Sequence, residues 1–152
     1  MSKPILAQAI ATGVSQAAAT SQVDGFASGI IDEITINGIA STGSAAGSIT
    51  GLVAATMANR IEIASGYPSV SAELLGICTG IVKHLHDDAI LIYPAFPYIN
   101  SGEITNLDGS VLAGYVKTES GYPNVSAELL GMCTGIVTHL MDNAECNGGT
   151  IV

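Results

Sequence analysis

The sequence predicts a mainly α-helical fold built from tandem helical hairpins, with short β segments in the linkers and the C-terminal tail. Three observations support this: an internal copy, apolar residues at helical spacing, and a stripe of small residues beside them. The copy is Ser120 to Leu140, SGYPNVSAELLGMCTGIVTHL, which repeats Ser65 to Leu85, SGYPSVSAELLGICTGIVKHL, with three differences. One element therefore occurs at least twice along the chain.

The apolar residues of the copied segment lie on one side of a helix. They start at Leu74 and recur at offsets typical of a buried helical face; they are Leu74, Ile77, Cys78, Ile81, Val82 and Leu85, repeated as Leu129, Met132, Cys133, Ile136, Val137 and Leu140. Ser71 precedes them as a helix N-cap, and Glu73 follows where the helix dipole favours an acid.

A second stripe consists of small residues at four-residue spacing. Interior glycine costs a helix about 0.5–1 kcal/mol relative to alanine, so its recurrence requires a reason. Close approach of another helix in a soluble assembly supplies one. The predicted helix-packing interface comprises Ala72, Gly76 and Gly80, their copies Ala127, Gly131 and Gly135, and Gly25 and Gly29 from a diverged copy 51 positions upstream.

These patterns predict a single domain of repeats, each with a shorter first helix, a turn and a longer second helix. Residues 1–36 form the diverged repeat 1, 47–88 repeat 2 and 102–143 repeat 3, with linkers at 37–46 and 89–101 and a tail at 144–152. A hairpin with one apolar face cannot bury it alone. The repeats are therefore expected to pack together, as a pseudo-threefold bundle or as a short row.

The first half of the chain contains four predicted elements. Pro4 to about Thr20 is the first helix, and Thr20 or Ser21 caps the second. Ile34 to Ile36 is a candidate short strand at the end of the second helix. Ile49 to Ile63 is expected to form the first helix of repeat 2, and its second helix is expected to end near Asp88.

The second half begins with Ala89 to Tyr93, a predicted short strand that the following prolines interrupt. The first helix of repeat 3 is expected to begin near Asp108, and the second to end near Asn143. Thr150 to Val152 follows an Asn-Gly-Gly turn and resembles a strand. We expect this end of the chain to pair with the edge of a neighbouring chain.

The composition predicts a subunit of an assembly. Charged residues are 11% of the chain, against about a quarter in ordinary soluble domains, and the mean hydropathy is +0.49. Other subunits are therefore expected to cover part of the surface, most simply in a homo-oligomer. The net charge of −9 argues against nucleic acid and anionic membrane as partners, because both attract basic patches.

The N-terminal residues imitate a secretory signal only loosely. Gln8 and Thr12 interrupt the apolar part, and the same stretch is needed as the first helix. No run of 18 strongly apolar residues occurs, which argues against a membrane-spanning helix. Synthesis in the cytoplasm without a cleaved signal is therefore expected.

The three cysteines divide into two kinds. Cys78 and Cys133 occupy equivalent positions on the apolar face, where a buried small residue explains them without reactivity. Cys146 lies in the polar tail and is expected to be the exposed thiol. An intermolecular disulfide through Cys146 is a candidate interaction in an oxidising setting.

No catalytic, cofactor or metal site is predicted. His84 and His139 lie six positions after their cysteines, on a different side of the helix, and no Cys-x-x-Cys or His-Glu-x-x-His pattern occurs. Repeat 1 has Glu33 at the equivalent position. The histidines are expected to be polar residues near the negative ends of their helices.

The low charge, the bias toward Ala, Gly, Ser and Thr, the tandem GYPxVSAELLGxCTGIVxHL and the NAECNGGTIV tail resemble small structural proteins of tailed-bacteriophage virions. This resemblance implies a non-enzymatic subunit of the tail, baseplate, neck or capsid surface. It carries over no functional residues. Two alternatives remain: a membrane-active or secreted helical protein, and a small enzyme that uses His84, His139 and a cysteine.

Overall fold

The fold is mainly α-helical, with a smaller antiparallel β region, as the sequence predicts. The computed structural model describes residues 1–152. The helices are α1 (Lys3–Gly13), α2 (Ser21–Asn37), α3 (Ala54–Ser65), α4 (Ala72–Asp87), α5 (Gly109–Ser120) and α6 (Ala127–Asn143). No helix has the length and apolar character needed to cross a membrane.

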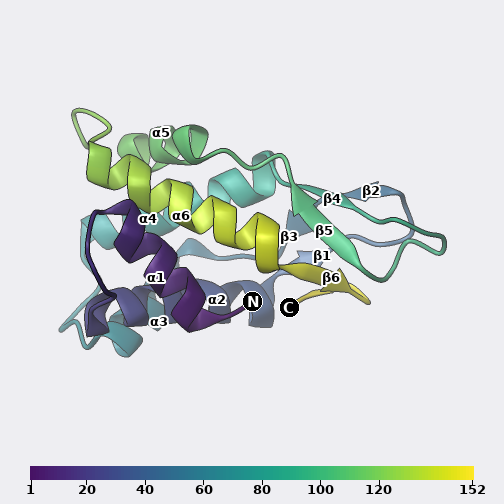
Figure 1. The fold of residues 1–152 in the computed structure, drawn as a ribbon, viewed down its shortest axis with the longest axis horizontal. Helices are drawn as coiled ribbons and strands as arrows, with labels where there is room; N and C mark the ends of the chain where they lie inside the picture. The colour runs from purple at the N-terminus through teal and green to yellow at the C-terminus, as the bar shows by residue number, and fades with distance from the viewer.

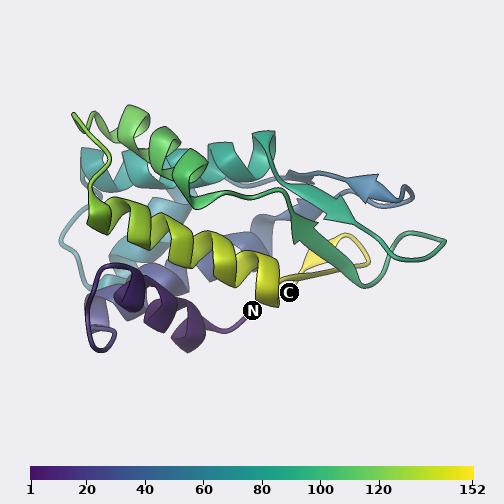
Figure 2. The same cartoon turned by 45° about the horizontal axis from the view of Figure 1, so that its top comes forward.

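The helices pack as a closed bundle (Figures 1 and 2). The most extensive contacts join α2 to α3, α4 to α5, and α6 back to α1. The sequence-adjacent pairs α1–α2, α3–α4 and α5–α6 also touch. Each helix therefore packs on two others, and the contact between α6 and α1 closes the bundle.

Glycines mark the closest helix approaches. A Cβ atom at Gly76 would lie 2.6 Å from the Cα atom of Ser120, and one at Gly80 would lie 2.7 Å from the backbone nitrogen of Val116. Four further glycines of the predicted interface make similar approaches: Gly25 to Ser65, Gly29 to Ile61, Gly131 to Gly13 and Gly135 to Ala9. Since real Cβ atoms do not come this close to backbone, these crossings require glycine.

The prediction is wrong for Ala72 and Ala127, which are exposed. Each is the first residue of its helix, α4 or α6. The helix crossing begins one turn later, at Gly76 and Gly131, so the two alanines lie beyond the contact. The packing surface is therefore shorter than the small-residue stripe suggests.

Local signals start the second helices at equivalent points. The side-chain oxygens of Thr20, Ser71 and Ser126 each accept a hydrogen bond from the backbone N–H three residues later. This pairing satisfies one of the N–H groups that the first turn leaves free. The expected ends of α4 and α6 and the expected start of α5, which Asp108 caps, are confirmed.

Two predicted boundaries in the first half are wrong. The first helix ends at Gly13, and Ser15 adopts a φ of 60° as the chain turns back toward α2. Residues 34–36 belong to α2, because the Ile34 side chain is buried on the helical face that packs against α3. Tertiary burial here overrides the strand preference of β-branched residues.

The start of the first helix of repeat 2 also differs from the prediction. Ile49 lies in a strand, where it pairs with Ala40, and α3 begins only at Ala54. Gly51, with a φ of 84°, turns the chain between the strand and the helix. A sequence window over 49–63 cannot detect this pairing, because the partner strand lies outside it.

Strands from three separate segments gather beyond one end of the bundle (Figure 1). They are β1 (Ile39–Ala40), β2 (Ala46–Gly47), β3 (Ile49–Thr50), β4 (Ile90–Ile92), β5 (Gly102–Thr105), β6 (Glu145–Asn147) and β7 (Thr150–Ile151). β1 pairs with β3, and a five-stranded antiparallel sheet has the order β2-β4-β5-β6-β7. The C-terminal strand thus pairs within its own chain, with β6.

One face of the sheet continues the helical core. Leu91, Ile104, Cys146 and Ile151 are all buried and belong to the same hydrophobic cluster as the helices. Their neighbours in the strands point the other way and are exposed. The sheet is therefore anchored to the bundle by its inner face, and its outer face is free.

Candidate functional site

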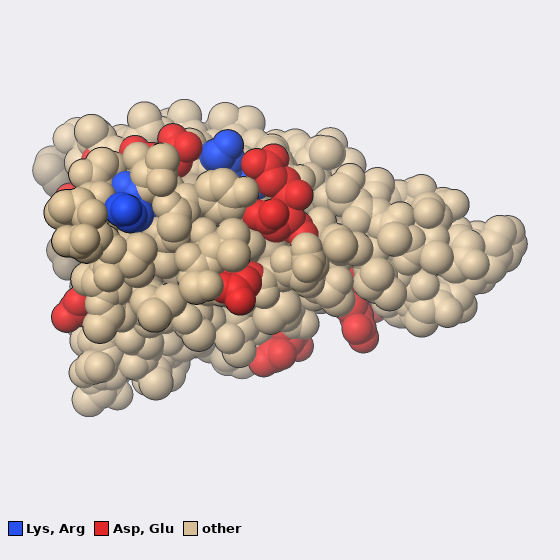
Figure 3. Space-filling model, turned by 90° about the horizontal axis from the view of Figure 1, so that it is seen from above, with Lys and Arg blue, Asp and Glu red and all other residues tan.

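The most distinctive surface is the arm, which we define as residues 38–53, 89–107 and 144–152. It tapers away from the helical bundle (Figure 1). The arm has only two charged residues, Glu103 and Glu145. Figure 3 shows the charged side chains gathered over the bundle, whereas the tapered end is free of them on this face. A projection with so few charged side chains is typical of a surface that other molecules cover.

The loop between β4 and β5, residues 93–101, forms the tip of the arm (Figure 1) and carries the most exposed large hydrophobic side chain of the protein. Phe96 is 84% exposed, and its ring meets that of Tyr98 edge-on with a centroid distance of 5.9 Å. The tip backbone is held to other segments, since Gly43 N–H donates to the Tyr98 carbonyl and Gly148 N–H donates to the Ile99 carbonyl. Phe96 therefore lies in a loop whose backbone is hydrogen-bonded to two other segments of the chain.

The outer face of the sheet extends this apolar surface. In β4, Ile90 and Ile92 are exposed on either side of the buried Leu91. Strand alternation places both isoleucines on the same face. Phe96 and Ile99 in the loop that follows β4 are exposed as well, and we call these four side chains the apolar strip; they lie in a segment predicted to be a linker. Glu103 of β5 pairs with Ile92, so a carboxylate borders the strip. The sequence feature that could have identified this strip is the alternating AILIY segment, which is followed by aromatic residues beside prolines.

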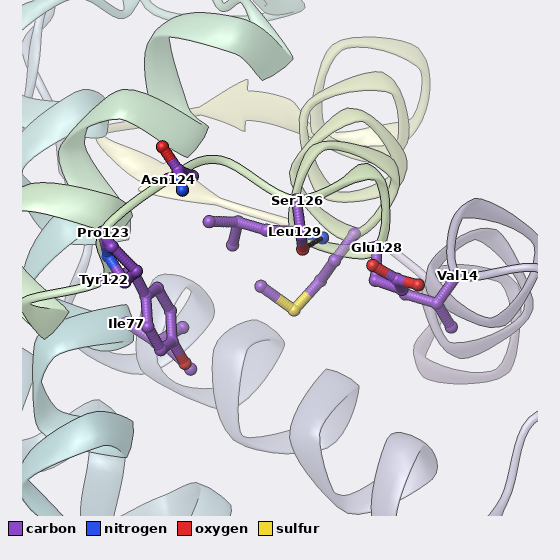
Figure 4. Close-up of a pocket in the computed structure, with 9 residues that line it drawn as sticks. Val14, Ile77, Tyr122, Pro123, Asn124, Ser126, Glu128 and Leu129 are labelled. Carbon is purple, nitrogen blue, oxygen red and sulfur yellow. Dashed lines mark hydrogen bonds between the residues drawn. The ribbon is translucent and has the colours of Figure 1, made fainter.

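A second feature lies at the opposite end of the bundle, where α2, α4 and α6 begin. Two adjoining cavities of about 460 and 850 Å³ share Val14, Ile77, Glu128 and Met132 in their walls. Figure 4 shows the smaller cavity, with Tyr122 and Ile77 toward one side and Glu128 toward the other. This hollow has room for an apolar side chain or a small ligand.

The rim of this hollow combines acids with a tyrosine. Glu73 and Glu128 lie in the first turns of α4 and α6, where the helix dipole favours them. The Tyr122 hydroxyl donates a hydrogen bond to Glu73. Burial, and then this bond and the charge of Glu73, raise the pKa of Tyr122 to about 12. The tyrosine therefore joins the turn before α6 to the start of α4.

The thiols of Cys78 and Cys133 are buried and have raised pKa values. Cys78 and Cys133 are buried on the apolar face, as predicted, and burial raises the pKa of each thiol to about 12. The thiolate is the reactive form of cysteine, and little of it exists at neutral pH when the pKa is this high. In this fold the two thiols are therefore held mainly in the protonated form.

The prediction that Cys146 is exposed is wrong. Cys146 is 0% exposed, because β6 places it on the inner face of the sheet between Gly102 of β5 and Ile151 of β7. Burial raises its pKa to about 11, and the charge of Glu145 adds to this effect. A disulfide with another chain would require the strand to leave the sheet.

His84 and His139 lie near the C-terminal ends of α4 and α6, as predicted, and the fold buries both of them. His84 and His139 are each 2% exposed, and Glu33 at the equivalent position of α2 is 0% exposed. These are the three polar or charged residues that the fold buries. No group of three or more His, Cys, Asp or Glu side chains is arranged to hold a metal ion.

Comparison of the chain with protein-family models, with curated proteins and with solved structures gives no match.

Proposed function

We propose that the chain is a non-enzymatic assembly subunit that contacts further copies of itself and neighbouring subunits through the arm. The observation that carries this proposal is the 84% exposure of Phe96, which lies in the loop between β4 and β5 on an arm with only two charged residues. Aromatic side chains at the centre of interfaces supply much of the binding free energy. Burying one phenylalanine side chain is worth about 1.5–3 kcal/mol.

The fold supports the arm, and not the helices, as the contact surface. The glycine-lined faces of α2, α4 and α6 are covered within the chain by α3, α5 and α1. The helices and the inner face of the sheet share one hydrophobic cluster. The outer face and tip of the arm are not covered in this way, and they are the surface that we propose for a partner.

The proposed setting is the virion of a tailed bacteriophage, which rests on the resemblance in composition and repeat style. A tapered arm on a compact body suits insertion between neighbouring subunits of a ring or tube. Such contacts need at least about 1,000 Å² of buried surface to be stable. The apolar strip of the arm would form the centre of that surface.

The experiment is a measurement of native mass over a range of concentrations, with the variant Phe96→Ser. Wild-type protein is expected to self-associate, and the variant to need roughly thirtyfold more protein, as for loss of an aromatic hot spot. Ile63→Ser is the matched control, because Ile63 is 80% exposed but lies on α3. A wild-type monomer at all concentrations, or equal effects of the two variants, would contradict the proposal.

A membrane-active protein would use the same tip, since exposed Phe and Ile side chains also enter lipid interfaces. Flotation with vesicles of neutral phosphatidylcholine separates the two functions. Binding of wild-type protein but not Phe96→Ser, without self-association, would favour the membrane alternative.

A further inference from the structure

The hollow between the starts of α2, α4 and α6 is lined by equivalent positions of these three helices. Each helix contributes two apolar residues about one turn apart, and these are Val23 and Phe26 of α2, Leu74 and Ile77 of α4, and Leu129 and Met132 of α6. One turn further along, the equivalent Ile30, Ile81 and Ile136 are at most 1% exposed. The hollow is therefore the open end of the core that the three helices share.

The two ends of this core are covered differently. At the C-terminal ends of the three helices the arm lies over the core, since β7 packs on α2, β3 on α4 and β5 on α6. At the N-terminal ends the hollow is open, and Ile77 and Met132 in its walls are only half-buried. Apolar walls that stay in contact with water favour a partner that covers them.

The charges around the hollow restrict what can enter it. Its lining includes two acids, Glu73 and Glu128, and no Lys, Arg or His. Neither acid takes part in an ion pair. An acidic surface is repelled by these carboxylates, and this chain has 13 acids against four bases. A second copy can therefore enter the hollow only with a part that carries no acid.

The tip of the arm meets this requirement. Residues 93–101, YPAFPYINS, contain no charged side chain. Phe96 projects from them as the most exposed large hydrophobic residue, and a cavity of about 460 Å³ has room for its ring. The exposed Asn100 and Ser101 follow, and their amide and hydroxyl groups can donate hydrogen bonds to carboxylates at the rim. The tip thus matches the hollow in size, polarity and charge.

The tip and the hollow lie at opposite ends of the molecule (Figure 1). The arm follows the C-terminal ends of α2, α4 and α6, whereas the hollow lies between their starts. These helices have 16 or 17 residues, which corresponds to a length of about 25 Å. The tip points away from the hollow of its own chain, so the two can meet only between copies.

We propose that the tip of one copy inserts Phe96 into the hollow of the next copy, an inference that rests on the proposed function of the arm. The contact joins two different surfaces, so a pair of copies still has one free tip and one free hollow. A head-to-tail contact of this kind forms a ring if the rotation between copies closes, and a filament if it does not. Association therefore continues beyond the dimer.

Two complementary variants test this contact through native mass. Phe96→Ser removes the tip residue, and Met132→Arg fills the hollow with a charged side chain. Met132 lies four residues after Glu128 on α6, so the new arginine gains a favourable ion pair on the helix. Met141→Arg is the matched control, because Met141 is exposed on the same helix but does not line the hollow.

We expect Met132→Arg to need roughly thirtyfold more protein than wild type to associate, and Met141→Arg to stay within about twofold of wild type. An equimolar mixture of Phe96→Ser and Met132→Arg is the decisive sample. At a concentration where each alone is monomeric, the mixture should form dimers and nothing larger. One variant supplies the intact hollow and the other the intact tip, whereas a contact between two tips would not be restored by mixing.

Two results would overturn the head-to-tail contact: association of Met132→Arg at wild-type concentrations, or a mixture that stays monomeric. If Phe96→Ser alone lost association in that experiment, the arm would remain the contact surface and only its place of binding would be wrong. A wild-type protein that is monomeric at all concentrations would overturn both proposals.

Methyl NMR of a protein with an unaltered hollow covers the case in which Met132→Arg does not fold. Phe96→Ser protein carries isotope-labelled methionine methyl groups, and unlabelled wild-type protein is added. The ring current of an inserted Phe96 should shift the Met132 signal. The signals of the buried Met57 and of Met141, near the other end of α6, should stay unchanged. An unchanged Met132 signal, or an equal shift of Met141, would overturn the inference.

Discussion

The helices α4 and α6 have almost the same sequence but pack against different neighbours. Gly80 of α4 meets the backbone of Val116 in α5, whereas the equivalent Gly135 of α6 meets Ala9 in α1. Both contacts are close because both helices present glycine. One glycine-lined helix surface can therefore pack against two different helices, as long as the backbone of each partner lies against the glycines.

The same two helices differ at their ends. Nε2 of His84 accepts a hydrogen bond from the backbone N–H of Asp108, whereas Nε2 of His139 has no hydrogen-bond partner. The difference arises from the partner and not from the helix, because both histidines are equally buried. The shared sequence therefore fixes the start and the buried face of the helix, while the neighbouring segment decides which polar bonds form.

The largest expected effect is steric and concerns the glycine contacts. Gly80→Ala and Gly135→Ala should each lower the free energy of unfolding by about 3 kcal/mol, since the added Cβ meets backbone atoms that no rotamer change can move. In both cases the nearest atom would lie 2.7 Å away. Urea denaturation measures the loss.

Gly114→Ala is the control for these two variants. Gly114 lies in α5, and a Cβ there would meet nothing within 4 Å. This substitution should stabilise the protein by about 0.5–1 kcal/mol, as expected for alanine in a helix. If Gly135→Ala were tolerated while Gly80→Ala was not, the contact between α6 and α1 would be looser than its counterpart.

The second prediction uses the difference between the histidines. His84→Ala should cost about 1–2 kcal/mol more than His139→Ala at neutral pH, because it also leaves the N–H of Asp108 without an acceptor. The cavities left behind are alike, since both side chains are 2% exposed. Equal losses of the free energy of unfolding in urea denaturation would contradict this prediction and would mean that the bond to Asp108 adds no stability.

The second helices were predictable because their signals are local. The cap at Ser71, the apolar face from Leu74 and the glycine spacing all lie within one segment, and the predicted end near Asp88 is confirmed. Residue-level patterns also identified the equivalence of Glu33 and His84. The hydrogen bonds that these two side chains accept were missed, because their donors, the backbone N–H groups of Val53 and Asp108, lie 20 and 24 residues further along the chain.

The strands predicted at Ala89 to Tyr93 and at Thr150 to Val152 are confirmed as β4 and β7, but the arm that they help to build was not predictable, for the same physical reason. Its five-stranded sheet takes two to four residues at a time from three segments that the sequence separates widely. No window of sequence contains both partners of the pair Gly102 and Cys146. Burial of Cys146 and exposure of Phe96 follow from this pairing, so neither could be predicted from local sequence patterns.

The smallest predicted effect concerns the turns before α4 and α6, which share the sequence Gly-Tyr-Pro. Tyr122→Phe should cost about 0.5–1 kcal/mol, because the Tyr122 hydroxyl bonds to Glu73. Tyr67→Phe should cost less, since no hydrogen bond of the Tyr67 hydroxyl accompanies the equivalent turn. Urea denaturation of both variants at neutral pH tests this difference.

Alkaline titration gives the same comparison an independent readout. The pKa of Tyr122 is raised to about 12, so the folded protein retains this proton where the unfolded chain, near 10, has lost it. The contribution of the protonated Tyr122 to the free energy of unfolding is fully present below the pKa of the unfolded chain. It is lost as the pH rises through about 12, the pKa in the folded protein. Tyr122→Phe should remove the last phenolate absorbance step. If Tyr67→Phe removed it instead, the two turns would have exchanged roles, and the hydrogen bond to Glu73 would not be what distinguishes them.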